Sequence, residues 1–264
     1  MTPYLLVDHV SKIFPPADGR GEGLCVFEDV TLEIARGEFV TMIGHSGCGK
    51  STLLNIIAGL ERPTGGGVVL EGREVVRPGM DRMVVFQNFS LMPWMTAFDN
   101  IRLAVRAAHP TWSRAEVAAH VHRWVDMVGL AGAEAKRPAA LSGGMRQRVG
   151  LARAFSTQPK VLLLDEPFAQ IDALTRSVIQ DELVRMWSAS RNTVFMVTHD
   201  VDEAILLSDR IALMTRGPQA KLAEQVEVKL ARPRRRADLI DDPEFLRLRT
   251  HILRFLVEGS LAVT

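Results

Sequence analysis

Cysteine is scarce in this sequence, which has only Cys25 and Cys48 among its 264 residues. Two cysteines give no disulfide framework, so we expect a protein of a reducing compartment. The length is sufficient to bury a sizeable core, as one large domain or as two closely joined ones. The apolar content of 47% is that of a globular protein.

Charge imbalance and long hydrophobic runs are also missing. Lys and Arg number 32 against 31 Asp and Glu, which argues against a dominant nucleic-acid-binding surface. No run reaches the roughly 18 apolar residues of a membrane-spanning helix, and residues 1–8 do not resemble a signal peptide. We therefore expect a soluble protein that reaches any membrane through a partner.

A glycine-rich stretch organises the rest of the chain. It follows an apolar run at 39–43 and precedes a helix-forming run at 53–58, the context that a GxxxxGK[ST] phosphate loop requires. Its glycines permit inward-pointing N–H groups beside a helix N-terminus, which makes an anion site, although a flexible turn is the alternative. Lys50 would add a charge at the β/γ-phosphates, and the Ser51 hydroxyl would reach magnesium. The stretch consists of Gly44, His45, Ser46, Gly47, Cys48, Gly49, Lys50, Ser51 and Thr52.

Two buried strands are predicted to end in polar side chains. The run 83–87 ends in Gln87, which is either solvated or a ligand for magnesium or water. The apolar run 161–164 is followed by Asp165 and Glu166, and ligands of open α/β sheets bind at the carboxyl ends of such strands. Asp165 would hold magnesium, and Glu166 would accept a proton from the attacking water, a role typically worth about 10²–10⁴-fold in rate. The alternative is a solvated acidic turn.

The strand signals fade over residues 90–158, which predicts an inserted helical subdomain. Ser113 and Glu116 have the spacing of a capping box. Further on, Ser142 would cap a long helix whose first N–H groups form a second anion site. The residues that follow this serine are Gly143, Gly144 and Met145.

Phe14 and His199 each admit two interpretations. Phe14 precedes a loop-like stretch and is either a core residue or a platform on which a base stacks. His199 ends the buried run 193–198, where it is either structural or in contact with a γ-phosphate.

The C-terminal third carries two more amphipathic segments. Over residues 173–188, Val178 and Ile179 are among the apolar side chains expected to face a core. Asp242 and the following proline predict the start of a final helix, whose apolar stripe we expect to pack on this chain or on a second copy. The arginine-rich run 232–236 is interpreted as a solvated surface, and the alternative is a contact with RNA or an anion.

Taken in this order, the motifs resemble those of the ATPase subunit of an ATP-binding-cassette transporter, over nearly the whole chain. The resemblance implies an α/β P-loop NTPase fold: a RecA-like core with an antiparallel β subdomain, an inserted α-helical subdomain and a short helical C-terminal tail. The implied domains are 1–90 with 159–225 for the nucleotide-binding core and β subdomain, 91–158 for the helical subdomain with the signature motif, and 226–264 for the C-terminal helical extension.

The resemblance also implies the cofactors, ATP and Mg²⁺, and a role for each motif. Residues 44–52 become the phosphate cradle, and residues 142–145 the family signature. The implied roles of the single residues are adenine stacking for Phe14, γ-phosphate and magnesium sensing for Gln87, the magnesium-side acid for Asp165, the general base for Glu166 and the switch histidine for His199. The loop 168–172 departs from the family's usual Ala-Leu-Asp, because Gln170 and Ile171 precede Asp172.

In this family the signature of one subunit closes over ATP held by another. The implied working unit is therefore a head-to-tail dimer of ATPase subunits, with a second copy or a paralogue, on the cytoplasmic face of the inner membrane. Further implied partners are integral membrane permease subunits, whose coupling helix would dock near residues 88–94, and indirectly a periplasmic or lipid-anchored substrate-binding protein. No nucleic-acid partner is expected.

Several short phrases resemble the nitrate, taurine and sulfonate importer group, closest to its nitrate/nitrite/cyanate/bicarbonate branch. They lie at 44–48, 82–88, 93–94 and 216–218. The favoured function is an ATPase that drives import of a small anion, nitrate or nitrite first. The alternatives are a taurine or alkylsulfonate importer, a soluble cassette ATPase of DNA repair or translation, and a non-catalytic nucleotide sensor.

Overall fold

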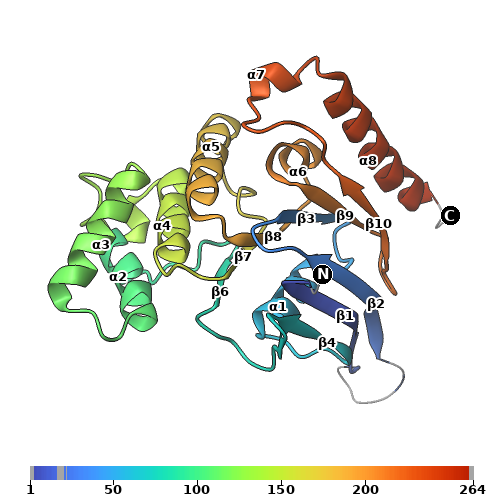
Figure 1. Cartoon of the computed structure of the whole chain (residues 1–264), viewed down its shortest axis with the longest axis horizontal. Coiled ribbons are helices and arrows are strands. Elements are labelled where there is room, and N and C mark those ends of the chain that lie inside the picture. The colour runs from blue at the N-terminus through green and yellow to red at the C-terminus, as the bar shows by residue number, and fades with distance from the viewer. Residues whose placement is uncertain (1–2, 17–20, 22, 262–264) are drawn as a thin grey trace. The chain divides into compact units, whose positions relative to one another are not determined.

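A computed structural model describes residues 3–16, 21 and 23–261 of the chain. The residues divide into two compact units, one of Met1–Pro78 with Thr193–Thr264 and one of Gly79–Asn192 (Figure 1). Among the helices of the described residues, none is both long enough and apolar enough to cross a membrane.

The first unit contains an antiparallel sheet in the order β2-β1-β4-β5. Its longest strands alternate in burial because one face packs on a core: Val30, Leu32 and Ile34 are fully buried, whereas residues between them are not. This sheet is the expected antiparallel β subdomain. Its strands are β1 (Leu5–Phe14), β2 (Leu24–Ile34), β4 (Gly65–Leu70) and β5 (Arg73–Glu74).

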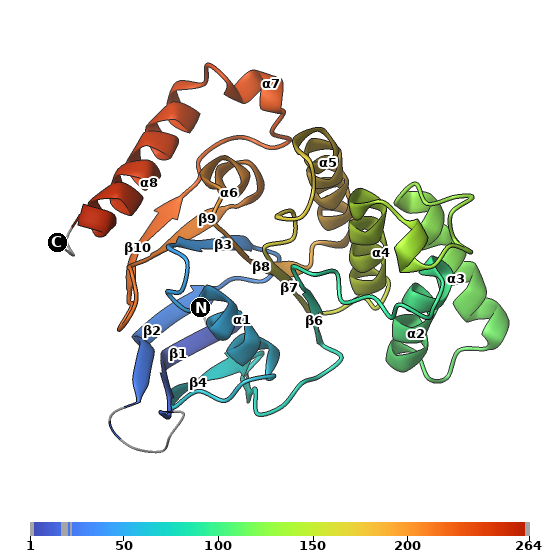
Figure 2. The ribbon, with the colours of Figure 1, turned by 180° about the vertical axis from the view of Figure 1, so that it is seen from behind.

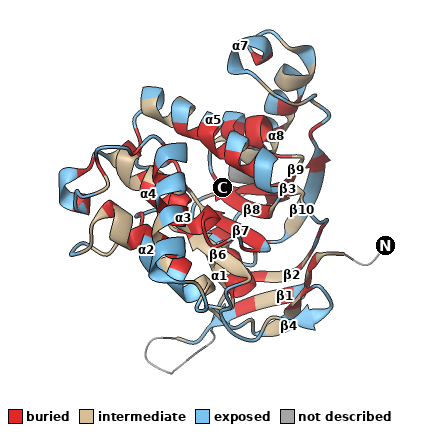
Figure 3. Ribbon diagram, turned by 60° about the vertical axis from the view of Figure 1, so that its left-hand side comes forward, coloured by how far each residue is buried: buried red, intermediate tan, exposed pale blue. Residues whose placement is uncertain are grey.

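Four further strands of the first unit lie in the order β10-β9-β3-β8. Strand β3 pairs in parallel with β8 and β9, and β10 pairs antiparallel with β9. Every residue of β3 and β8 is buried (Figure 3), which is typical of parallel strands covered on both faces. The strands are β3 (Phe39–Gly44), β8 (Thr193–Thr198), β9 (Arg210–Met214) and β10 (Leu222–Glu227).

The helices of the first unit are α1 (Lys50–Ala58), α6 (Val201–Leu207), α7 (Arg236–Leu239) and α8 (Pro243–Leu261). Helix α8 runs beside β10 and α6 (Figures 1 and 2). Asp242 caps it, because its Oδ1 accepts from the N–H groups of Glu244 and Phe245, both at 2.9 Å. Leu248 and Ile252 are fully buried in a cluster with residues of β3, α6, β9 and β10. The predicted final helix and its packing on this chain are thus confirmed.

In the second unit, β6 (Arg82–Val85) pairs in parallel with β7 (Val161–Asp165). The predicted helical region contains α2 (Ala97–Ala108), α3 (Arg114–Met127), the short 3₁₀ helix η1 (Pro138–Ala140) and α4 (Gly143–Phe155), and α5 (Ala173–Ser190) follows β7. The capping box is confirmed: Ser113 Oγ accepts from Glu116 N at 3.2 Å, and Glu116 Oε2 accepts from Ser113 N at 2.7 Å.

Two expectations about side chains are wrong. Val178 is 48% exposed, so it lies outside the buried face that Ile179 and Leu183 form on α5. The arginine-rich run is only partly a solvated surface, since Arg232 and Arg234 are bound to carboxylate and carbonyl oxygens of the first unit. The spacing of apolar and charged residues along the sequence predicts neither the exposure of Val178 nor the partners of the two arginines, because both depend on residues distant in the chain.

Candidate nucleotide-binding and catalytic site

The stretch 44–52 forms a turn between β3 and α1 that tolerates few side chains. Gly47 and Gly49 have φ angles of 80° and 97°, in the left-handed region that favours glycine. A Cβ on Gly49 would lie 2.6 Å from side-chain atoms of Val26 and Phe27, whereas one on Gly47 would meet nothing within 4 Å. Gly49 is thus required by both conformation and packing, and Gly47 by conformation alone.

The Lys50 ammonium lies inside this loop. It donates to the carbonyl oxygens of Gly44 at 2.7 Å and His45 at 2.9 Å, and Nζ is 3.9 Å from Cys48 Sγ. Both Lys50 and Cys48 are buried, and burial raises the pKa of the Cys48 thiol, against the opposing effect of the nearby Lys50 charge. The loop therefore presents a desolvated cation at the start of α1, where backbone N–H groups also favour anions.

The His45 ring faces a different element. Its Nε2 lies 2.8 Å from the carbonyl oxygen of Leu256 on α8. His45 belongs to the predicted phosphate cradle, and its own carbonyl oxygen does accept from Lys50 inside the loop. Sequence reasoning did not assign a separate role to this side chain, because Leu256 lies 211 residues away.

His199 leaves the sheet beside the phosphate loop. Ile43 pairs with Thr198 in the parallel register, so the next residues, Gly44 and His199, follow the same edge. Phe14 is 37% exposed at the end of β1, where it pairs with Leu24 of β2. The strand register therefore places His199 next to the start of the phosphate loop. It also pairs Phe14 with β2, the strand whose Val26 and Phe27 pack against Gly49 of that loop.

In the second unit, register brings Gln87 and the two acids to one edge. Val85 pairs with Leu164, and Asp165 ends β7. Strand β6 is shorter than predicted, so Gln87 lies in an exposed turn two residues after its end. Glu166 has a φ angle of 43°, an uncommon left-handed conformation for a non-glycine residue. Non-glycine residues in this backbone conformation cluster at functional sites, where the surrounding structure fixes how the side chain is oriented.

The signature stretch begins α4 as predicted. Ser142 caps the helix, since its Oγ accepts from Met145 N at 3.2 Å. Gly144 has no room for a side chain, because a Cβ would lie 2.4 Å from Thr175 Cγ2 on α5. A Cβ on Gly143 would be 3.2 Å from the Gln170 carbonyl oxygen. The two glycines thus allow α5 and the loop before it to approach the start of α4.

In the unusual loop 168–172, Phe168 and Ile171 are buried, whereas the other three residues are exposed. Ile171 is buried, and Asp172 caps α5 by accepting from Thr175 N at 3.0 Å. Hydrogen bonding to that N–H lowers the pKa of the Asp172 carboxyl. The departure from the family pattern therefore supplies a buried side chain and leaves the helix cap in place.

Sequence reasoning missed Arg153, which joins the Gln87 turn to α4. Its guanidinium donates to the carbonyl oxygens of Ser90 at 2.7 Å and Phe89 at 3.0 Å, and burial lowers its pKa. Phe89 and Ser90 have φ angles of 62° and 44°. An arginine that holds two left-handed residues fixes the path of the chain just after Gln87.

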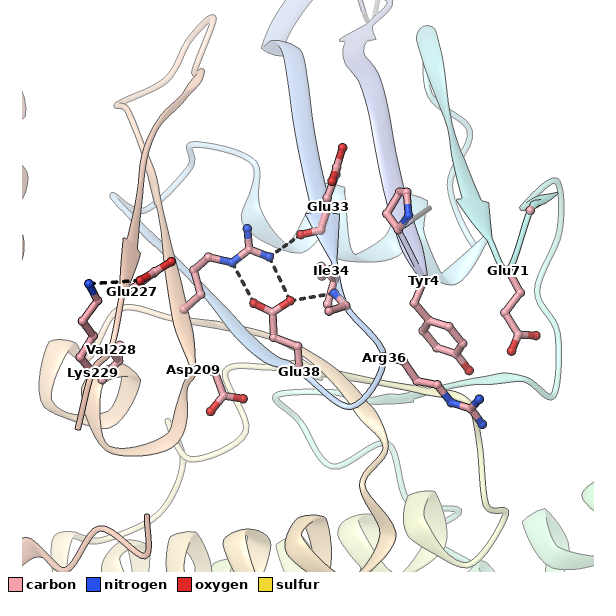
Figure 4. A pocket seen from close by; sticks show the side chains of 14 residues that line it. Tyr4, Glu33, Ile34, Arg36, Glu38, Glu71, Asp209, Glu227, Val228 and Lys229 are labelled. Carbon is pink, nitrogen blue, oxygen red and sulfur yellow. Dashed lines mark hydrogen bonds and ion pairs between the residues drawn. The ribbon is translucent and has the colours of Figure 1, made fainter. Parts of the chain in front are cut away.

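A cavity of about 1000 Å³ lies elsewhere in the first unit (Figure 4). Its lining includes the residues before β3 and at the start of β9, the opposite ends of these strands from the phosphate loop. Arg210 donates to both Glu38 oxygens, at 2.8 and 3.0 Å, and also to Gln225 and the Glu33 carbonyl. These groups fasten β2, β3, β9 and β10 together, and we assign the cavity no part in nucleotide binding.

The structure assembles the predicted site residues as two sets. Phe14, the loop 44–52 and His199 belong to the first unit, and Gln87, Asp165, Glu166 and residues 142–145 belong to the second. Among the described residues, no cluster of three or more His, Cys, Asp or Glu side chains is placed to hold a metal. Magnesium does not need such a cluster, because it is commonly held by one or two carboxylates together with substrate phosphates.

Comparison with known families identifies the class to which this fold and these motifs belong. A family model described as ABC transporter matches residues 27–169, which include the phosphate loop, the signature and the acidic strand. The chain belongs to the ABC transporter family, and within it the chain is an ATP-binding ATPase with the P-loop NTPase fold.

Among curated relatives, the chain is similar to ATP-binding proteins of nitrate import and of bicarbonate transport. The chain is 51% identical to the nitrate import ATP-binding protein NrtD of Synechococcus elongatus, over 97% of this chain and 92% of that protein. It is 47% identical to the bicarbonate transport ATP-binding protein CmpD of the same species, over 96% and 90%. It also matches NrtC of Synechocystis, at 50% identity over 99% of this chain, but spans only 39% of that longer protein.

Solved structures agree with this assignment. The ATP-binding cassette MJ0796, in a dimeric post-hydrolysis state bound to ADP and Pi, is 29% identical to the chain with a TM-score of 0.75. The superposition covers 86% of this chain and 100% of that one. The expected α/β P-loop fold is therefore confirmed.

Proposed function

We propose that this chain is the ATP-hydrolysing subunit of an importer that takes up a small anion, with nitrate or nitrite as the first candidate. The observation that carries the catalytic part is the phosphate loop, which places the buried Lys50 ammonium against the Gly44 and His45 carbonyls. The cargo rests on the relatives, because an ATPase subunit does not touch the transported ion. NrtD at 51% identity supports nitrate, and CmpD at 47% supports bicarbonate as the second candidate.

The residues present fit ATP and Mg²⁺. The backbone of the cradle is closely packed by the rest of the chain, since a Cβ on Gly44 or Gly49 would meet protein atoms at 2.8 or 2.6 Å. Lys50 and the N–H groups at the start of α1 would hold the phosphates, and Phe14 would stack on the adenine. Ser51, Gln87 and Asp165 offer the oxygen ligands that magnesium prefers, and the ion would neutralise charge on the phosphates.

Glu166 is the proposed general base and His199 the proposed γ-phosphate contact. Glu166 would accept a proton from the attacking water, and the Gln87 turn, held by Arg153, would orient that water. The Oγ of Ser142 is engaged as the acceptor of its own helix cap, and its O–H remains a donor. Together with the N–H groups of Gly143 and Gly144, this donor suits a phosphate presented by a second subunit, as in a head-to-tail dimer.

The catalytic proposal is tested by phosphate release from Mg-ATP and by equilibrium ATP binding. Lys50→Ala should weaken ATP binding, because the loop loses its charge. Glu166→Gln should retain binding, lose at least about 10²-fold in turnover and favour a nucleotide-bound dimer. Asp126→Asn, an exposed acid on α3, is the matched control and should behave as wild type. Normal hydrolysis by Glu166→Gln would remove this residue from the role of base.

The cargo proposal is tested in cells that lack this chain. Restoring the wild-type gene should restore uptake of labelled nitrate, and the Glu166→Gln gene should not. Uptake of labelled bicarbonate and of taurine, measured in the same cells, distinguishes the alternative importers. Recovery of the chain with membrane permease subunits, at the cytoplasmic face of the inner membrane, would support the proposed partners and location, and a substrate-binding protein would associate through the permease.

A further inference from the structure

The last described helix reaches the phosphate loop. His45 follows the final residue of β3, and its Nε2 lies 2.8 Å from the Leu256 carbonyl oxygen of α8. A carbonyl oxygen only accepts, so the imidazole N–H is the donor. The half-buried His45 ring therefore turns toward the C-terminal helix.

Helix α8 is fixed along much of its length, so its carbonyl is a defined anchor. Leu248 and Ile252 are fully buried in the cluster that also contains Ile43 of β3. Arg249 Nε lies 2.6 Å from Asp202 Oδ1 on α6, and His251 Nε2 lies 2.9 Å from Glu224 Oε1 on β10. Figure 2 shows α8 beside the strand and helix that carry these partners. The helix is held independently of its contact with His45.

The same histidine also takes part in the interior of the loop. Its carbonyl oxygen accepts from Lys50 Nζ at 2.9 Å and from Cys48 N at 3.3 Å. One residue is thus bound on the outside to α8 through its ring and on the inside to the phosphate-binding lysine through its backbone. Rotation of the His45 peptide would move the carbonyl that holds Lys50.

We propose that α8 positions the phosphate loop through the His45–Leu256 hydrogen bond, which makes His45 a positioning residue for nucleotide binding. The proposal rests on the proposed function, because it takes the loop to be the ATP site. A loop that samples several conformations binds its ligand more weakly, in proportion to the fraction that is competent. The α8 contact raises that fraction by holding the imidazole at the Leu256 carbonyl.

The test is steady-state ATPase kinetics and ATP binding with full-length variants. His45→Ala should raise the KM and Kd for ATP about 3- to 10-fold, the worth of one hydrogen bond, and change kcat less than twofold. His45→Gln keeps an N–H donor at the side chain's end and should recover at least half of the loss on a logarithmic scale. Arg249→Ala and His251→Ala, which remove other α8 contacts, should bind ATP within twofold of wild type.

A variant with a weakened α8 shows whether the loss of ATP affinity in His45→Ala depends on the packing of that helix. In a chain carrying Leu248→Ala and Ile252→Ala, shown by circular dichroism to be folded, adding His45→Ala should weaken ATP binding less than twofold. An undiminished effect there, a wild-type Kd for His45→Ala, or no recovery with Gln overturns the proposal. Lys50→Ala separates the two levels: if it loses ATP binding while His45→Ala does not, only the positioning role fails, and if it binds normally, the proposed ATP site fails.

Discussion

Arg148 and Glu182 form a two-point ion pair between α4 and α5. Arg148 Nε donates to Oε2 at 3.0 Å, and the Nη2 donates to Oε1 at 2.7 Å. The Glu182 side chain is 10% exposed and that of Arg148 is 22% exposed. The pair fixes the helix that begins with the signature stretch against the helix that follows the acidic strand.

Removing one partner of this pair should destabilise the protein. Glu182→Ala leaves the Arg148 charge largely shielded and unpaired, and should lower the free energy of unfolding by about 3 kcal/mol. Glu244→Ala is the matched control, because it breaks an exposed, solvent-screened pair with Arg247 on α8 and should lower the free energy of unfolding far less. Urea denaturation of the three proteins measures both values. Similar losses in the two variants would contradict the role of burial.

The capping box of α3 should make stability depend on acid pH. Hydrogen bonding to Ser113 lowers the pKa of the Glu116 carboxyl. The ionised form is therefore favoured in the folded state, so this contribution is present above the ordinary glutamate pKa of about 4.3 and is lost as pH falls through the lowered value. Glu116→Gln keeps the capping geometry without a charge. The wild type should thus be more stable than Glu116→Gln at neutral pH, by a margin that shrinks in acid; a pH-independent difference in melting temperature would contradict this.

Arg234 should be required for the end of α6. Its guanidinium donates to the carbonyl oxygens of Ile205 at 2.8 Å and Ser208 at 2.5 Å, and burial lowers its pKa to about 10. Further acceptors are the carbonyl oxygens of Leu206, Val228 and Leu230.

Arg234→Ala should lower the free energy of unfolding by about 3 kcal/mol, because several buried carbonyls lose their donor. Arg234→Lys should recover only part of this loss, since an ammonium does not reproduce the planar fork. Arg235→Ala, at the exposed neighbouring position, should cost about 0.5 kcal/mol or less. Equal effects at the two positions, measured in urea, would restore the interpretation of the whole run as a solvated surface.

The two thiols should differ in reactivity. Cys48 is buried with a raised pKa, whereas Cys25 is partly exposed. Because the thiolate is the reactive form, iodoacetamide at pH 8 should label Cys25 at least about 10-fold faster than Cys48. A Cys25→Ser protein isolates the slow reaction, which bound ATP should slow further. Mass spectrometry of timed samples measures the two rates, and rapid ATP-independent labelling of Cys48 would argue against a closed phosphate loop.

The strands, the helical insertion and the motif-bearing turns were predictable because each depends on residues close in sequence. Ser142, Asp242 and the Ser113–Glu116 pair act within one helical turn, and the structure confirms all three caps. The predicted catalytic and ligand roles stay predictions, since they concern groups that act on a nucleotide.

Interactions between distant residues were beyond sequence reasoning. The motif identifies Gly144 as a glycine, but only the approach of Thr175 explains why no other residue fits. Val178 has an apolar side chain at a helical position that the fold leaves exposed. Arg153 and Arg234 have partners that are backbone carbonyls, and a carbonyl carries no residue identity by which to be recognised.

The acceptor that α8 offers to His45 is likewise a main-chain carbonyl, which the sequence does not reveal. Because Leu256 contributes its main-chain oxygen, the position can change to another helix-forming residue without loss of the acceptor. Alanine scanning along α8 would not detect this hydrogen bond, because alanine keeps the carbonyl oxygen. For the same reason, we expect no correlated substitutions between positions 45 and 256 during evolution. The partner on the loop side is, by contrast, a single imidazole. In a comparison of relatives with and without a C-terminal helix, only the residue at position 45 would therefore reveal whether the contact is present.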